Sequence, residues 1–383
     1  MTRAWIVGLA ACGVAACSAR SEPTLLVREE TTPYPGAFGD TTFVAPSFLV
    51  TGGVRQYALG ELWDGSLRVV GWEPQGGFPS LPRNTHLATS TPYALIAARG
   101  EAWLVRPKNE ASWGSVYMER VALDGTPLAT DGRWVVGVRY EAAASTLQVV
   151  EVGAAELHAE YTTARYPRRA VPVDGGFLVF ASDPGGGPPG WIAIRPGATA
   201  GPEFEEVSEP GLGVVFDAYA EPGEVVVGAW TWAEGDGAQR GAQVLRLAVA
   251  GVAPVWPAHA RLELPDLDAR EGAAFLAWQG GLGVVEQLET DYAYDPARCP
   301  GGYWAEHAWP WPCRARSAGR AYVVRDAGGE LTATPVLLPY VELEFPIFEH
   351  WDRAGARVAV SAGRIGLIEG PPYAVSWYRL VEP

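Results

Sequence analysis

From Thr41 onward, the chain consists of short apolar runs separated by turn residues. The runs are four to eight residues long, are rich in Val, Leu, Tyr and Trp, and are bounded by Gly, Pro and Asp. Sustained 3.6-residue periodicity, which would indicate amphipathic helices, is absent. The pattern therefore predicts a domain built of β-strands over residues 41–383.

Pairs of these runs recur as two kinds of hairpin. One kind is represented by YALIAARGEAWLVRP at 93–107 and FLAWQGGLGVVEQL at 275–288. The other kind is represented by MERVALDGTPLAT at 118–130 and YVVRDAGGELTAT at 322–334. Both place glycine where a tight turn needs a positive φ, which other side chains resist. We interpret each as an antiparallel pair of strands.

The first kind of hairpin repeats along the chain. A four-stranded unit that repeats at such a spacing is typical of a β-propeller blade. We therefore predict an all-β fold, a β-propeller in which seven blades are favoured over six or eight. The third and fourth repeats have no clear boundaries in the pattern. Hairpins of the first kind begin near residues 48, 93, 133, 177, 214, 275 and 357, mostly about 40 to 60 residues apart.

The last predicted blade lacks one strand. YAVSWYRLVEP at 373–383 supplies only a third strand, and the sequence then ends. The only spare strand-like run near the N-terminus is LLVR at 25–28, so we expect a closing strand at 24–28. Closing the ring in this way removes an exposed sheet edge. The alternative is that all of 18–40, which is rich in Pro, Gly, Ser and Thr, is a tether.

Residues 1–17 have the pattern of an export signal. Arg3 precedes an apolar stretch at 5–16 that is too short to span a bilayer. The stretch VAAC, which ends at Cys17, resembles the lipobox of bacterial lipoproteins, in which small residues precede the lipidated cysteine. This resemblance implies an exported protein that is anchored to a membrane by lipid on Cys17. Ser18 after the cysteine favours the outer membrane.

Two other interpretations of this segment remain open. The stretch LAAC at 9–12 also fits a lipobox, but lipidation of Cys12 would leave an apolar stretch of only seven residues. An ordinary secretory signal, cleaved near Ala19, would discard both cysteines.

Export decides how the remaining cysteines are interpreted. If Cys12 is removed and Cys17 carries lipid, only Cys299 and Cys313 stay available, and an oxidising compartment would pair them. A zinc site is the competing use, but two cysteines and His307 fall short of the four ligands of a structural site. We therefore expect a disulfide that staples an insertion at 299–313.

This stapled insertion, CPGGYWAEHAWPWPC, combines aromatic side chains with prolines that restrict the backbone. It lies between two predicted hairpins, so we expect it on one rim of the ring. Rigid amphipathic rings lose little entropy on binding, which makes them good contacts for a partner. The alternative is that these rings cap the core of the propeller. The candidate partner-binding residues are Tyr303, Trp304, Trp309 and Trp311.

Charge excludes one class of partner and leaves many carboxylates to consider. The formal net charge is −15, so the domain repels phosphate backbones and we do not expect nucleic acid to bind. A glycosidase needs two carboxyl groups at a fixed separation, and spacing along the chain selects no such pair. We interpret the carboxylates as solvated surface. They cluster at Glu203, Glu205, Glu206 and Glu209, in PDLDAR at 265–270 and in DYAYD at 291–295.

Motifs for catalysis, cofactors and metals are missing. The sequence contains no HExxH, no GxSxG elbow, no Walker loop and no GxGxxG before a helix, and no two histidines are closer than 43 residues. We therefore predict no catalytic residue, no cofactor and no metal site, and we favour a protein that is not an enzyme.

These features predict a monomeric, membrane-anchored binding or scaffold lipoprotein of the bacterial envelope. Its rim loops would recognise a protein or a glycan. The alternative is an exported carbohydrate-active hydrolase or lyase that uses carboxylates at the mouth of the propeller channel. Fold alone does not separate the two, since propellers host both.

Overall fold

The computed structural model is built almost entirely of β-strands. Within the residues that it describes, helical structure is limited to one 3-10 helix, η1 (Pro210–Leu212), and no helix is long and apolar enough to cross a membrane. The described residues are 25–33, 43–52, 55–62, 67–71, 85–90, 93–98, 101–107, 116–141, 143–197, 201–232, 239–269, 272–291, 313–339, 342–345, 358–361, 363–369 and 374–381.

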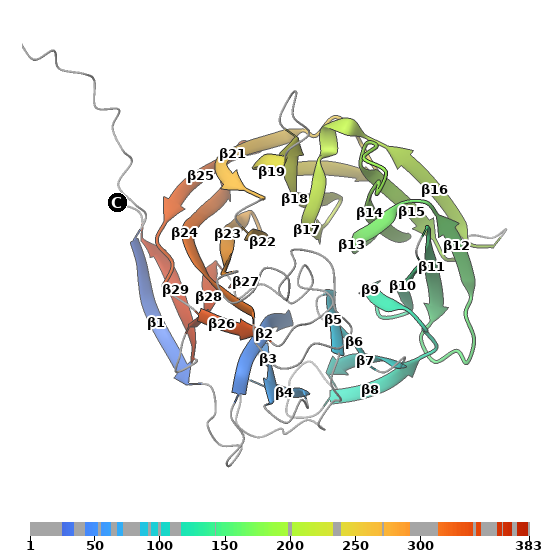
Figure 1. Cartoon of the computed structure of the whole chain (residues 1–383), viewed down its shortest axis with the longest axis horizontal. Coiled ribbons are helices and arrows are strands. Elements are labelled where there is room, and N and C mark those ends of the chain that lie inside the picture. The colour runs from blue at the N-terminus through green and yellow to red at the C-terminus, as the bar shows by residue number, and fades with distance from the viewer. Residues whose placement is uncertain are drawn as a thin grey trace, which may run out of the picture.

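The strands form seven antiparallel sheets in the described part of the chain, arranged in a ring (Figure 1). We number these sheets as blades 1 to 7 in chain order. Blade 1 consists of β2 (Phe43–Gly52), β3 (Arg55–Leu62) and β4 (Leu67–Gly71). Blade 2 consists of β5 (Thr85–Ser90), β6 (Tyr93–Ala98), β7 (Glu101–Pro107) and β8 (Val116–Val121). Blade 3 consists of β9 (Thr126–Thr130), β10 (Trp134–Tyr140), β11 (Ser145–Glu151) and β12 (Ala159–Thr163).

Blades 4 to 7 complete the ring. Blade 4 consists of β13 (Tyr166–Val173), β14 (Gly176–Ser182), β15 (Gly190–Arg195) and β16 (Glu203–Ser208), and blade 5 of β17 (Val214–Glu221), β18 (Glu224–Trp232), β19 (Gln239–Ala250), β20 (Ala253–Pro254) and β21 (Ala260–Asp268). Blade 6 consists of β22 (Gly272–Gln279), β23 (Leu282–Asp291), β24 (Cys313–Asp326), β25 (Leu331–Val336) and β26 (Glu342–Phe345). Blade 7 consists of β27 (Val358–Ser361), β28 (Arg364–Glu369), β29 (Ala374–Val381) and β1 (Leu25–Pro33).

The first strands of the blades, β2, β5, β9, β13, β17, β22 and β27, surround the axis of the ring (Figure 1). From β5 to β27 each of them contacts the first strand of the next blade, and β27 contacts β2. The prediction of a seven-bladed propeller is therefore confirmed.

The ring is closed by the N-terminal strand, as the sequence predicted. β1 pairs antiparallel with β29, from Leu25 opposite Val381 to Pro33 opposite Ala374. The guanidinium of Arg28 donates two hydrogen bonds, of 3.1 and 2.9 Å, to the hydroxyl oxygen of Tyr378. The strand runs beyond the expected 24–28 because an outermost strand tolerates polar residues such as those at 29–32.

The hairpins of the first kind, 93–107 and 275–288, form β6–β7 and β22–β23 as predicted. The prediction of a hairpin at 118–130 is wrong, because β8 and β9 belong to different blades. Gly125 in their connection serves a close approach: a Cβ there would lie 2.4 Å from the carbonyl oxygen of Val138. A turn glycine in the sequence therefore marks connections between blades as well as hairpins within them.

The apolar cores lie between neighbouring blades. Between blades 3 and 4, for example, Val136 and Leu147 of one blade pack with Phe177 and Ile192 of the other, and all four are fully buried. Burying such a side chain completely stabilises the fold by about 1.5–3 kcal/mol. Both faces of a blade are covered in this way, which explains why inner strands are almost continuously apolar.

Candidate binding site

The connections between strands fall on two rims of the ring. On one, which we call the loop rim, lie residues 141–144 and 183–189, between the second and third strands of blades 3 and 4, and residues 209–213, which lead into blade 5. On the opposite rim, the turn rim, lie turns between first and second strands, such as 131–133 and 174–175.

Two charged residues from neighbouring first strands meet near the axis. Arg169 of β13 and Asp217 of β17, the axial pair, form an ion pair with 3.7 Å between Nε and Oδ1, and both side chains are largely buried. Asp217 also accepts hydrogen bonds from the backbone N–H of Leu276 on β22 (3.3 Å) and of Ala218 (3.1 Å). One carboxylate thereby joins the inner strands of blades 4, 5 and 6.

Backbone bulges position both members of the axial pair. The register of β13 against β14 shifts between Pro167 and Arg169, and that of β17 against β18 shifts between Val215 and Asp217. A bulge inserts one residue, bends the strand and redirects a side chain. The insertion of Phe216, which packs in the core, leaves Asp217 facing Arg169.

Burial governs the electrostatics of this pair. Loss of water raises the pKa of Asp217 to about 6, and the nearby charge of Arg169 opposes that rise. Burial, followed by the charge of Asp217, raises the pKa of Tyr219 well above its usual value. At neutral pH the carboxylate is mainly ionised and its charge is balanced by Arg169.

A group of aromatic and basic side chains lies on the loop rim, where β13 begins. The rings of Tyr140 and Tyr166 stack, with centroids 4.5 Å apart and planes at 21°. The guanidinium of Arg168 lies 5.4 Å from the centroid of Tyr166, and its Nε donates to the hydroxyl of Ser182 at 3.0 Å. All three members of this stacked tyrosine group, Tyr140, Tyr166 and Arg168, are half-buried. Flat rings beside a cation suit recognition of a protein or a sugar.

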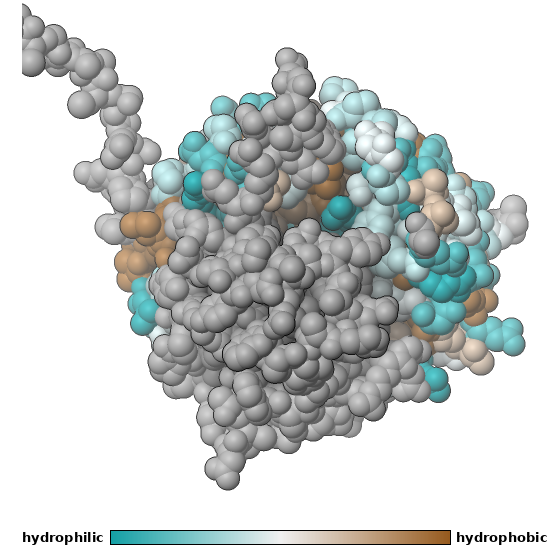
Figure 2. Space-filling view, viewed as in Figure 1, coloured by the Kyte–Doolittle hydropathy of each residue, from teal (hydrophilic) through white to brown (hydrophobic). Residues whose placement is uncertain are grey.

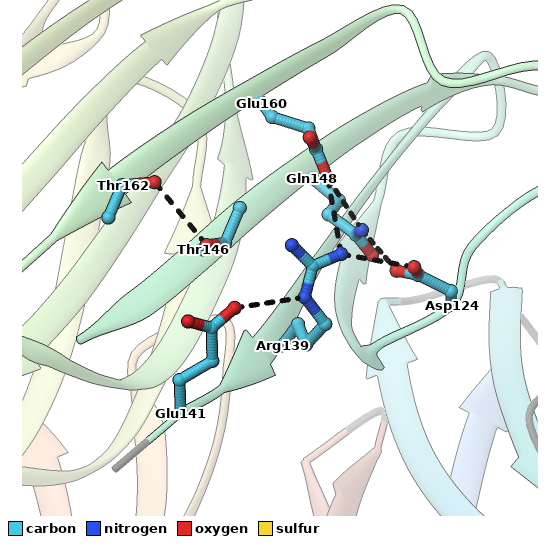
Figure 3. A network of polar contacts seen from close by, with 7 residues as sticks. All are labelled: Asp124, Arg139, Glu141, Thr146, Gln148, Glu160 and Thr162. Atoms are coloured by element: carbon cyan, nitrogen blue, oxygen red, sulfur yellow. Dashed lines mark hydrogen bonds and ion pairs between the residues drawn. The ribbon is translucent and has the colours of Figure 1, made fainter. Parts of the chain in front are cut away.

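A polar network lies next to the loop rim on the face of blade 3 opposite Tyr140 (Figure 3). The guanidinium of Arg139 pairs with Asp124 (3.0 Å), Glu141 (3.3 Å) and Glu160 (3.4 Å). Hydrogen bonding to Glu141, and then the charge of Asp124, raises the pKa of Arg139. The side-chain nitrogen of Gln148 donates to Asp124 and, at 2.9 Å, to Glu160. The three carboxylates share one guanidinium and one neutral amide, so hydrogen bonds satisfy the network while it keeps a formal net charge of −2 (three negative groups against one positive group).

Buried glutamines anchor the connections that lead into blades. Gln148 holds Asp124, which precedes β9. Gln243 donates to the carbonyl oxygens of Gly211 (3.2 Å) and Leu212 (2.9 Å), which precede β17. Gln287 accepts from the backbone N–H of Asp268 at 3.2 Å and donates to its carbonyl, just before β22. Sequence reasoning missed these residues, although a single glutamine inside an apolar strand was a signal that could have found them.

The carboxylates singled out in the sequence serve several local contacts. Glu203 and Glu205 lie on the edge strand β16, half exposed, within 3.5 and 3.8 Å of Arg195. Glu206 pairs with the buried Arg165 at 2.7 Å, and the side chain of Glu209 caps η1. Glu206 is exposed in spite of this ion pair, and its partner Arg165 ties the connection before β13 to blade 4.

Asp266 has a similar local role in blade 5. Its Oδ2 accepts a hydrogen bond of 3.0 Å from the hydroxyl of Tyr322 on β24. Burial, assisted by this bond, raises the pKa of Tyr322 to about 12. Over the described ranges no group of three or more His, Cys, Asp or Glu side chains is arranged to hold a metal.

The predicted lipidation, disulfide and aromatic sites remain predictions. Cys17, Cys299, Tyr303, Trp304, Trp309 and Trp311 lie outside the described residues. The backbone of Cys313 begins β24 and pairs with Phe345 of β26. The strands on either side of the insertion, β23 and β24, are paired as far as Asp291 and Arg314, at their loop-rim ends.

No protein-family model matches the chain, and a search of curated proteins found no similar sequence. Among solved structures, the chain is similar to the Dos1 propeller, with 13% identity, a TM-score of 0.42, and coverage of 84% of this chain and 75% of that one. It is also similar to the β-propeller domain of the Trilobed protease from Pyrococcus furiosus, with 10% identity, a TM-score of 0.44, and coverage of 90% and 97%. The β-propeller assignment rests on the seven sheets and the ring of inner strands.

Proposed function

We propose that the chain is a lipid-anchored, non-catalytic binding or scaffold protein of the bacterial envelope. Its loop rim would recognise a protein or a glycan. The observation that carries this proposal is the pairing of β23 with β24 up to Asp291 and Arg314. The two strands that flank the aromatic insertion therefore end on the same rim as the stacked tyrosine group.

In this proposal, two candidate contact surfaces share one rim. The stacked tyrosine group lies at the junction of blades 3 and 4. The insertion at 299–313 belongs to blade 6 and supplies Tyr303, Trp304, Trp309 and Trp311. A closed ring suits this task, because loops on a rigid frame lose little entropy when a partner binds.

The N-terminal motif supplies the anchor in this proposal. VAAC at 14–17 would direct acylation of Cys17, and the chain would reach the ring through residues 18–24. Ser18 supports an outer-membrane location. An anchored ring with an acidic surface suits a partner in the envelope and disfavours nucleic acid.

A second candidate, a carbohydrate-active hydrolase or lyase, is favoured by one observation. Asp217 is a buried carboxyl near the axis with a pKa raised to about 6, and such a shift is common in catalytic acids. A glycosidase needs a second carboxyl roughly 5 to 9.5 Å away. The contacts of Asp217 among the described residues are with Arg169 and two backbone N–H groups, which suits a structural link. Binding therefore remains the first proposal.

Mass spectrometry of the mature N-terminus tests the anchor directly. We expect an acylated Cys17 and recovery of the protein in the membrane fraction, with Cys17→Ser released from it. An unmodified N-terminus at Ser21 or Glu22 would remove the lipid anchor from the proposal.

A further inference from the structure

Exposed apolar side chains gather on the outer wall of blades 6 and 7. Among the described residues, the large apolar side chains that are exposed are Val27 (41%), Val255 (48%) and Leu337 (76%). Val27 lies on β1, the outermost strand of blade 7, and Leu337 follows β25, an outermost strand of blade 6. Leu26 packs against the apolar cluster that contains Leu338. Figure 2 shows brown, apolar surface at the left of the ring, where Figure 1 places β1 and the end of β25.

The N-terminal chain meets the ring at this wall. Seven residues, 18–24, separate Cys17 from Leu25, the first residue of β1. Even fully extended, the eight steps from Cys17 to Leu25 span at most about 29 Å. A lipid on Cys17 would therefore keep the start of β1 closer to the bilayer than the far side of the ring.

Charge on the far wall favours the same orientation. β16, the outermost strand of blade 4, lies across the ring from β1 (Figure 1). It exposes Glu203 and Glu205, two carboxylates that share the single guanidinium of Arg195 and so keep a net negative charge, which anionic lipid headgroups repel. On β1, by contrast, the carboxylate of Glu29 has a guanidinium of its own, that of Arg379, at 3.0 Å.

We propose that the wall patch, formed by the exposed side chains of Val27 and Leu337, rests on the lipid bilayer. The ring would then stand with its wall, and neither rim, toward the membrane. This inference rests on the proposed lipid anchor. Its consequence is that the loop rim stays open to a partner of the envelope while the protein is anchored.

Quenching by spin-labelled lipid tests this orientation in the acylated full chain. Val27→Cys is labelled with a thiol-reactive fluorophore, and Glu205→Cys on the opposite wall is the matched control. Both are placed in phosphatidylethanolamine–phosphatidylglycerol vesicles that contain a lipid with a nitroxide headgroup. We expect most of the emission at position 27 to be lost and that at position 205 to be retained.

A second pair of variants separates contact with the bilayer from mere proximity. With the label at position 27, Leu337→Glu should restore part of the emission, because a charge in the patch opposes its entry into the lipid interface. Val255→Glu, at an exposed apolar position in blade 5, should leave the quenching unchanged. Equal quenching at positions 27 and 205, or none at 27 in a chain that floats with the vesicles, would overturn the orientation alone. A chain that does not float with them would overturn the anchor and, with it, the orientation.

Discussion

The ion pair between Arg169 and Asp217, with 3.7 Å between Nε and Oδ1, links the innermost strands of two blades. The same carboxylate accepts a hydrogen bond from Leu276 in the next blade. Three blades therefore meet at a single side chain. Burial raises the pKa of this carboxyl group from 3.8 to about 6. Proton binding at Asp217 and the stability of this part of the ring must depend on each other.

Asp217→Asn should change the pH dependence of stability. Because the folded state binds the proton more tightly than the unfolded state, the stability that this proton contributes is present below pH 3.8 and is lost as pH rises through about 6. Across that range, the free energy of unfolding of the wild type should fall relative to the variant by roughly 3 kcal/mol at most. Urea unfolding at several pH values measures this difference.

A control for this experiment is Ala220→Ser, at an exposed position of the same strand as Asp217. Its difference from the wild type should not change with pH, because neither alanine nor serine titrates in this range. Parallel stability curves for the wild type and Asp217→Asn would contradict the assignment of a raised pKa to Asp217.

Removal of the closing strand should destabilise the ring. Deletion of residues 24–33 from the mature chain removes the pairing with β29, the bonds from Arg28 to Tyr378, and the contact of Thr31 with Ser376 at 3.0 Å. We expect the melting temperature to fall by several degrees, as calorimetry would show. Deletion of residues 18–23, which leaves β1 whole, should not change it. Identical melting curves for the two deletions would mean that β1 contributes nothing to closure.

The repeat and the missing strand were enough to predict the ring from the sequence. Apolar runs with turn glycines gave seven repeats, and LLVR at 25–28 was identified as the closing strand by the lack of a fourth strand at the end of the chain. This pattern of apolar runs and turn glycines could not show that residues 118–130 cross between two blades. A glycine such as Gly125 is needed for a close approach, here to Val138, as well as for the turn of a hairpin.

The axial pair could not be predicted from the sequence for a different reason. Arg169 and Asp217 lie in separate blades, and two bulges, which no residue pattern signals, set their registers. The buried glutamines were missed because a polar residue in an apolar strand can also face solvent, and the sequence alone does not separate the two cases. In a blade covered on both sides it instead needs a partner, such as the backbone of Asp268 for Gln287.

Gln287→Met should therefore cost stability despite the similar shape of the two side chains. The fully buried amide binds both backbone groups of Asp268, and methionine would remove both of these hydrogen bonds. We expect a loss of about 1–3 kcal/mol in the free energy of unfolding. Thr332→Val, at an exposed position of the same blade, should stay within about 0.5 kcal/mol of the wild type. A loss for Gln287→Met that is no larger than this control would show that the anchor is dispensable.

Recognition through the loop rim is tested most directly by comparing partner recovery with stability in the double variant Trp309→Ala, Trp311→Ala. After crosslinking in intact cells, the wild type and the control Val255→Ala should recover the same envelope partner, and the double variant should lose it. If the rings are exposed contacts, stability should stay within about 0.5 kcal/mol per site. A stability loss of about 3–5 kcal/mol per site with unchanged partner recovery would contradict the account, because it would mean that the rings cap the core.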